Sequence, residues 1–485
     1  MAGKFLKFFA PFVRVMPEIK QPQREVSFKE KFIWTAVVLI VYLIMSNIQL
    51  FGVNVADTTD YYYWLRVILA SQRGTLTELG IGPIVTAGLI MQLLLGSRII
   101  KVDMSDPYDR AMFSGAQKVF AMILTIINTV SYLLGGAFGA LDQLGIVNAT
   151  FIFLQLLFAG LIIILLDELL QKGWGLGSGV SLFIAAGVSG QIFWNSFSFI
   201  QGPDGAARGI LVAFIQAFTD PDVNLGDLFL RPALPSILGS ITTLLIFTIV
   251  IWFESTRVEI PLTYRGYRGF KGKYPMKLLY VSNIPVILVN ALYANFLFFG
   301  QLIAGPNSGL RNSNTEFWLD LLGKFEQSSA GVSQGNYLVP TGGLLYYLSP
   351  PQGIEALLND PLRGIIYLVI FIFLCVMLGR VWVEVSGLAP RDIAGQIIDS
   401  GMSVPGFRTS ERIIERILKR YIPTLVILNG IIIAVMSFFA DSLGALTSGT
   451  GLLIAIGIVH QYAETISKEV AASQYPGMRA FLGLD

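Results

Sequence analysis

The sequence has little that supports metal, disulfide or acid–base chemistry. Its 485 residues include one cysteine, Cys375, and one histidine, His460. A disulfide needs two cysteines, and structural zinc sites draw on several cysteines and histidines. No Gly-x-x-x-x-Gly-Lys-Ser/Thr motif is present for nucleotide phosphates. We therefore predict no cofactor, no metal and no enzymatic activity, and any energy for transport must come from a partner.

Charge is also scarce, because only 14% of the residues are Asp, Glu, Lys or Arg, against about 25% in soluble domains. By contrast, 54% are hydrophobic, and the mean hydropathy is +0.66. A helix of roughly 20 apolar residues crosses a bilayer. Solidly apolar rather than alternating runs predict an all-α polytopic membrane protein with ten transmembrane helices. The predicted spans are 32–50, 78–97, 118–138, 148–166, 179–199, 236–253, 279–303, 364–383, 423–440 and 450–466.

Basic residues fix the predicted orientation. If the loops alternate sides, 27 of the 34 Lys and Arg residues fall on one side, together with both ends of the chain. The positive-inside rule makes that side cytoplasmic. No carboxylate lies in the middle of a span, which argues against a proton-coupled transporter. A secondary transporter for a small solute nevertheless remains the alternative to a polypeptide channel, and a membrane enzyme is a weaker third.

Two halves are expected from the span count. Spans one to five, in residues 1–200, begin on the cytoplasmic side, and spans six to ten, in residues 236–485, begin outside, as in an inverted repeat. Residues 201–235 would form an outer hinge loop rich in proline and glycine. Residues 57–71 are too short to cross. They fit either an interfacial helix or a re-entrant element that fills a cavity.

Several motifs, in order along almost the whole chain, closely resemble those of the SecY family, the central subunit of the Sec protein-conducting channel. The resemblance is to the archaeal and eukaryotic branch, in which the corresponding subunit is the alpha subunit of the translocon. The motifs are Leu79-Gly-Ile-Gly-Pro-Ile-Val-Thr-Ala-Gly88, Val258-Glu-Ile-Pro-Leu262, Lys273-Tyr-Pro-Met-Lys277, Val281-Ser-Asn-Ile-Pro-Val-Ile287, Gly406-Phe-Arg408 and Lys419-Arg-Tyr-Ile-Pro423.

The resemblance implies a channel that passes unfolded secretory polypeptides and releases membrane helices sideways into lipid, in an archaeal cell membrane. It implies a pore ring of Ile81, Val85, Val180, Ile184, Ile287 and Ile454. It identifies 57–71 as a re-entrant plug helix, with Tyr61, Tyr62, Tyr63, Trp64, Leu65, Arg66, Val67, Ile68 and Leu69 at its centre. It places Thr86, Asn128, Asn283 and Asn295 at a lateral gate, although a static interhelical contact is the competing reading.

The basic cytoplasmic loops 254–278 and 379–422 have two readings. Positive charge controls topology and attracts anionic lipid. The resemblance adds ribosome docking, in which Arg265, Arg268 and Arg408 contact ribosomal RNA phosphates. The glycines between 265 and 273 favour an extended hairpin tip, and Glu411–Arg420 predicts an amphipathic helix on the membrane surface. The implied partners are a SecE-type gamma subunit, a beta subunit, the translating ribosome, signal sequences, nascent polypeptides and the lipid bilayer.

Overall fold

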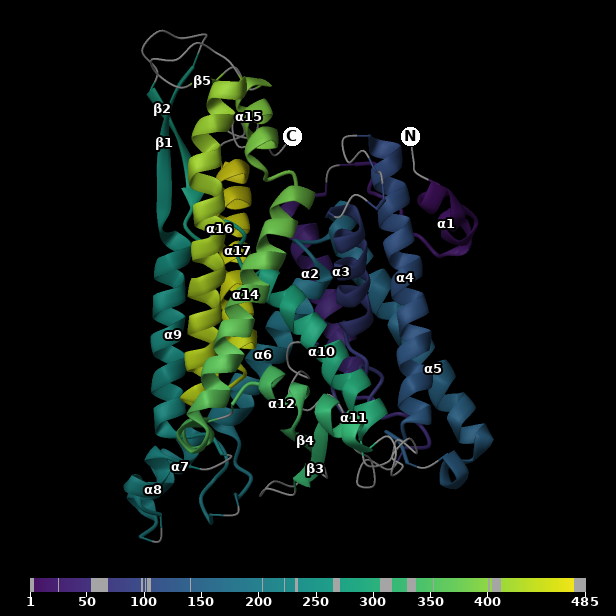
Figure 1. Ribbon diagram of the computed structural model, residues 1–485, viewed down its shortest axis with the longest axis vertical. Helices are drawn as coiled ribbons and strands as arrows, with labels where there is room; N and C mark the ends of the chain where they lie inside the picture. The colour runs from purple at the N-terminus through teal and green to yellow at the C-terminus, as the bar shows by residue number, and fades with distance from the viewer. Residues whose placement is uncertain are drawn as a thin grey trace.

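The computed structural model is a bundle of long helices with small sheets at its two ends (Figure 1). It describes residues 4–24, 26–53, 69–96, 99–100, 102, 106–139, 141–202, 204–221, 223–231, 234–264, 271–305, 316–328, 337–351, 353–399, 402–403 and 411–474.

Ten helices correspond to the ten predicted spans. They are α2 (Phe28–Met45), α3 (Gly82–Gly96), α4 (Pro107–Leu134), α5 (Leu141–Leu169), α6 (Gly179–Phe197), α9 (Ile237–Ser255), α10 (Ile284–Ala304), α14 (Pro361–Val385), α16 (Glu411–Ser442) and α17 (Gly449–Gln474). A single turn of π-helix, η2 (Leu170–Trp174), extends α5. Among the described residues, α4, α5, α6, α9, α10, α14 and α16 are long and apolar enough to cross a membrane.

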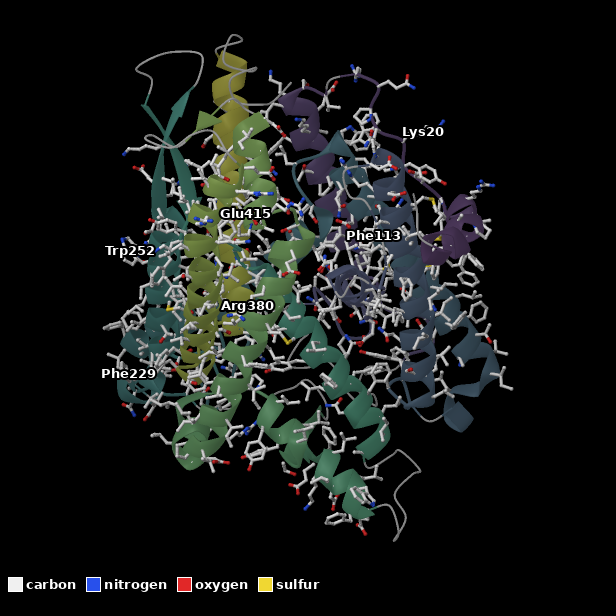
Figure 2. The ribbon with its side chains drawn as sticks, turned by 45° about the horizontal axis from the view of Figure 1, so that its top comes forward. Lys20, Phe113, Phe229, Trp252, Arg380 and Glu415 are labelled. Atoms are coloured by element: carbon white, nitrogen blue, oxygen red, sulfur yellow. The ribbon has the colours of Figure 1, made fainter. Side chains whose placement is uncertain are left out.

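The surface of the bundle matches this assignment. Large apolar side chains are exposed along the spans, including Leu244 on α9 and Phe373 on α14, which are 69% and 63% exposed. Trp252, at the left edge of Figure 2, belongs to the same exposed face of α9. Exposed apolar patches of this extent need a nonaqueous environment, and a bilayer supplies one.

The two halves meet along two seams. α3 packs against α10 and α14, and α6 packs against α17. One large apolar cluster runs through both halves and includes buried residues from all ten helices. The bundle therefore has its apolar core at the junction of the halves.

The second helix of each half begins in the same way. In α3 the second residue is Pro83, and three residues earlier Gly80 has a φ of 52°. In α10 the second residue is Pro285, and three residues earlier Ser282 has a φ of 51°. Proline suits the first turn of a helix, where its missing N–H is not needed.

The fourth and fifth helices of each half are joined by matching hydrogen bonds. Asp167, near the end of α5, accepts from the N–H of Val180 at the start of α6, at 3.0 Å. Asp441, near the end of α16, accepts from the N–H of Gly449 at the start of α17, at 2.7 Å. Both carboxylates thus cap the orphan N–H groups and the positive end of the following helix.

One end of the bundle carries a three-stranded antiparallel sheet. The expected hairpin is formed by β1 (Arg257–Tyr264) and β2 (Lys271–Lys277), and β5 (Met402–Ser403) adds to its edge. This sheet and α15 (Pro390–Asp399) tie the two basic loops together. α1 (Lys4–Val15) and the end of α17 lie toward the same end of the bundle (Figure 1).

The predicted surface helix at Glu411–Arg420 is wrong as a separate element. This stretch is the first part of α16, which runs unbroken to Ser442 through Pro423. Its apolar residues Ile414 and Leu418 are buried against α15 and the sheet. The amphipathic pattern therefore marks a protein contact in place of a lipid contact.

The opposite end carries the connections between spans. The predicted hinge loop contains two short helices, α7 (Ile210–Thr219) and α8 (Leu225–Phe229). Its Arg231 side chain is 2% exposed and donates to both carboxylate oxygens of Asp204, at 2.8 and 3.0 Å. Arg231 therefore holds residue 204 in place from 27 residues away, since a bidentate charged pair of this kind is geometrically specific. The long connection from α10 to α14 forms α11 (Glu316–Leu322), β3 (Lys324–Ser328), β4 (Tyr337–Gly342), α12 (Leu344–Leu348) and α13 (Gly353–Asn359).

Candidate pore and lateral gate

The six predicted ring residues all belong to the apolar cluster at the junction of the halves. Ile81, Ile184 and Ile454 are fully buried, at 0% exposure. Val85, Val180 and Ile287 are partly buried and pack against the same cluster. They come from the start of α3, from α6, from α10 and from α17. Val85 and Ile287 hold equivalent positions, because each stands two residues after the helix-starting proline.

A backbone hydrogen bond joins the end of the predicted plug to the first ring residue. Leu69, the one residue of the predicted plug centre within the described residues, is 3% exposed. Its carbonyl oxygen accepts from the N–H of Ile81 at 2.8 Å. A Cβ on Gly80 would lie 2.1 Å from that carbonyl oxygen, so only glycine fits this turn. The end of the plug segment is therefore locked to the start of α3.

Tyr42 ties the same turn to α2 and α6. Its hydroxyl donates to the Ala70 carbonyl oxygen at 2.7 Å, in a buried position. Its ring stacks on Phe183, with centroids 4.4 Å apart, next to the ring residue Ile184. Ala70 has a φ of 49°, which is uncommon for a residue other than glycine and indicates that its surroundings hold it in place.

One predicted gate pair forms a direct hydrogen bond across the seam. The Nδ2 of Asn295 on α10 donates to the Oγ1 of Thr86 on α3 at 3.0 Å. Asn295 also donates to the Ala291 carbonyl of its own helix. A second contact across the same side joins α4 to α10, where Tyr132 stacks on Phe298 at 5.3 Å. This side of the junction thus includes an interhelical polar bond and an aromatic stack.

The other two predicted gate residues lie in different surroundings. Asn283, just before α10, donates to the Leu453 carbonyl of α17 at 3.0 Å, so its bond does not cross from α10 to α3. Asn128 on α4 is 4% exposed, and its Oδ1 has no hydrogen-bond partner within the described part of the chain. The direct polar link from α3 to α10 is therefore made by Thr86 and Asn295.

Some predicted residues lie outside the described residues, namely Tyr61–Ile68 of the plug and the docking candidates Arg265, Arg268 and Arg408. Sequence reasoning missed other residues, including Tyr42 and the Tyr132–Phe298 stack. No local pattern distinguishes Tyr42 from any aromatic residue in an apolar span, because its role depends on Ala70, 28 residues later in the chain.

The arrangement defines a class of protein: a polytopic membrane protein of two half-bundles that meet at an uncharged aliphatic centre. Comparison with known families is consistent with this class. The SecY family profile matches residues 75–463, and the profile described as the plug domain of Sec61p matches residues 40–74. The chain belongs to the SecY family. The predicted plug at 57–71 lies within the plug-domain match.

Solved structures extend the likeness over nearly the whole chain. A structure of a protein-conducting channel is 37% identical, covers 96% of this chain and 98% of its own, and superposes with a TM-score of 0.79. A second structure, described as showing that the plug domain of the SecY protein stabilises the closed state of the translocation channel, is also 37% identical. Its coverage of both chains is the same, and its TM-score is 0.78. Sec61 in the canine ribosome–channel complex from the endoplasmic reticulum is 37% identical, with the same coverage of both chains and a TM-score of 0.76.

Proposed function

We propose that this chain is the pore-forming subunit of a protein-conducting channel, which passes unfolded secretory polypeptides and releases apolar helices sideways into lipid. One observation carries the proposal: the predicted ring residues share a single uncharged cluster at the junction of the halves, and the plug segment ends against the first of them. The matching turns at Gly80 and Ser282 and the matching caps at Asp167 and Asp441 support two inverted halves around that cluster.

The aliphatic ring would act by exclusion. A narrow apolar constriction disfavours water and ions, because it offers no polar group to replace their hydration. Branched aliphatic side chains can also surround a passing chain without binding any particular sequence. The plug, fixed at Leu69, would close the outer mouth while the channel is idle.

The seam between α3 and α10 would be the side exit. Polar bonds between membrane helices average about 0.6 kcal/mol. The Thr86–Asn295 bond is therefore weak enough for an apolar signal sequence to displace while it inserts at the seam. The aromatic stack of Tyr132 on Phe298 would keep the seam closed in the idle state.

The family resemblance supplies the proposed partners and location. These are a SecE-type gamma subunit, a beta subunit, translating ribosomes and signal-sequence clients, in the cell membrane with both termini cytoplasmic. The sheet of β1, β2 and β5 supports a docking role, since it holds the two basic loops at one end of the bundle.

Site-specific crosslinking of an arrested secretory chain tests the channel. Photoreactive probes at Val85 and Ile287 should both react with the client, and deleting its signal sequence should abolish both reactions. A probe at Leu244, on the exposed face of α9, is the control and should react with lipid only. Specific uptake of a small solute, without client crosslinks at the ring, would favour a secondary transporter instead.

Charge reversal tests ribosome docking separately. Arg268→Glu with Arg408→Glu should weaken ribosome binding and steepen its salt sensitivity, because phosphate contacts dominate such affinity. Membrane insertion should be intact. Arg14→Glu with Arg24→Glu, an equal total charge change at two exposed residues, is the control. Unchanged ribosome binding at low salt would remove these arginines from the interface.

A further inference from the structure

The base of the β1–β2 hairpin is tied to the membrane helices by a compact charge cluster. Lys277, the last residue of β2, has its Nζ 3.0 Å from Glu464 of α17 and 4.0 Å from Glu254 of α9. Arg257, which pairs with Lys277 in the sheet, also reaches Glu464, at 3.3 Å, and so does His460, at 3.4 Å. Three cationic or ionisable groups thus surround two carboxylates.

Glu254 is the buried member of this cluster. Its side chain is 2% exposed, and Lys277 is the basic group within 4.0 Å of it among the described residues. Its other oxygen, Oε1, accepts from the hydroxyl of Ser282 at 3.1 Å. The Glu254 carboxylate therefore bridges the end of the hairpin and the turn that starts α10.

Ser282 is held in an unfavourable backbone conformation. Ser282 and Ala70 are the two residues other than glycine with positive φ in the described part of the chain. Its carbonyl oxygen accepts from Asn429 of α16 at 3.2 Å, and the next residue, Asn283, is bonded to α17. A residue of this kind persists only while its partners over-determine it. The equivalent position in the first half is Gly80, which needs no such support.

We propose that Glu254 and Lys277 are positioning residues that couple the cytoplasmic hairpin to α10, the gate helix bonded to α3 through Asn295. When the hairpin moves and withdraws Lys277, Glu254 is left as a buried charge without its counterion. The carboxylate then takes up water or shifts outward, its hold on Ser282 weakens, and the start of α10 is free to move from α3. The inference rests on the proposed channel function.

The proposal makes opposite predictions for its two residues. Lys277→Met removes the counterion and should open the idle gate. Glu254→Gln removes the charge but keeps an oxygen that can accept from Ser282, so the idle gate should stay closed and stop responding to the hairpin. The double variant should behave as Glu254→Gln. Lys273→Met is the matched control, because Lys273 lies on the same strand and pairs with the exposed Glu259.

Spin-label distances between α4 and α10 measure the gate in the complex with its companion subunits. The labels are attached to cysteines introduced at the exposed positions Leu134 and Ile303. The native Cys375 is fully buried, so it should not be labelled. Ribosomes displaying a signal sequence supply the stimulus. Lys277→Met should raise the idle open population at least fivefold over Lys273→Met. Glu254→Gln should reduce the ribosome-driven rise at least fivefold, while ribosome affinity stays within twofold of the unaltered protein.

Three outcomes decide between the ideas. Suppression of the Lys277→Met opening by Glu254→Gln supports the coupling, because loss of stability alone would not be rescued by a second substitution. An idle gate that is the same in Lys277→Met and Lys273→Met, or a normal ribosome response in Glu254→Gln, overturns it. If the unaltered protein shows no ribosome-driven change and no client crosslinks at Val85 and Ile287, the proposed channel function fails first.

Discussion

Replacing Gly80 with alanine should unseat the plug from the idle channel. Gly80 has a φ of 52°, and a Cβ there would lie 2.1 Å from the Leu69 carbonyl oxygen and 2.9 Å from that of Ala70. An ordinary contact begins near 3.4 Å, so the two segments must separate by 3.4 − 2.1 = 1.3 Å. The bond from the Ile81 N–H to Leu69, now 2.8 Å, cannot survive that shift.

The size of the effect follows from two terms. A lost backbone hydrogen bond costs about 1 kcal/mol, and a left-handed conformation costs a residue other than glycine about 1 kcal/mol or more. Together they destabilise the seated plug by about 2 kcal/mol. Since 1.4 kcal/mol is about a factor of ten in an equilibrium constant, the unseated population should rise about thirtyfold.

Ion flux across vesicles that contain the idle complex measures this population. The Gly80→Ala variant should leak about thirtyfold faster than the unaltered protein. Gly190→Ala on α6 is the matched control, because a Cβ there meets no atom within 4 Å. If Gly80→Ala folds normally and leaks no more than Gly190→Ala, the Gly80 turn does not seat the plug, and this reasoning is refuted.

Three further predictions test other parts of the structure. Asn295→Leu should remove the bond to Thr86 at a cost of about 0.6 kcal/mol, which means roughly threefold more photocrosslinking of weak signal sequences; equal crosslinking would show that the bond does not restrain the gate. Arg231→Met should leave Asp204 unpaired and accelerate amide hydrogen exchange in residues 201–207, with Arg208→Met as control; unchanged exchange would contradict the restraint by Arg231. Lys172 donates a hydrogen bond that lowers the pKa of Glu18 below 4.5. The stability from this pair should therefore be constant above pH 4.5 and be lost as pH falls through the lowered pKa, in a thermal melt series from which Glu18→Gln removes the dependence.

Helical spans could be predicted because their signal is local and one-dimensional. Continuous apolar runs of about 20 residues have one stable form in a bilayer, and all ten predicted spans correspond to helices. The start of α3 differed from the prediction, at Gly82 instead of residue 78, because residues 75–81 form the turn that carries the plug. The motif around Gly80 identified the family, while the need for glycine there came from the nearness of Leu69.

Other features depended on residues far apart in the chain. The pattern of Glu411–Arg420 predicts an amphipathic helix on the membrane surface, whereas its apolar face packs on α15. Prolines and glycines in 201–235 predict a loop or hinge, and only the structure shows that Arg231 pairs with Asp204 within it. The family resemblance places Asn283 at the gate, and only the structure shows that its hydrogen bond goes to Leu453 of α17.

The sequence by itself determined that the chain lies in a membrane, how many times it crosses, and which end carries the positive charge. These properties depend on the apolar content and the charge of each local segment, because every segment partitions into the bilayer according to its own composition. The tertiary structure alone decided which polar side chains meet: Tyr42 with Ala70, Thr86 with Asn295, and Glu254 with both Lys277 and Ser282. Such pairs form where helices cross, and the crossing points are set by packing of the whole bundle and not by any local run of residues.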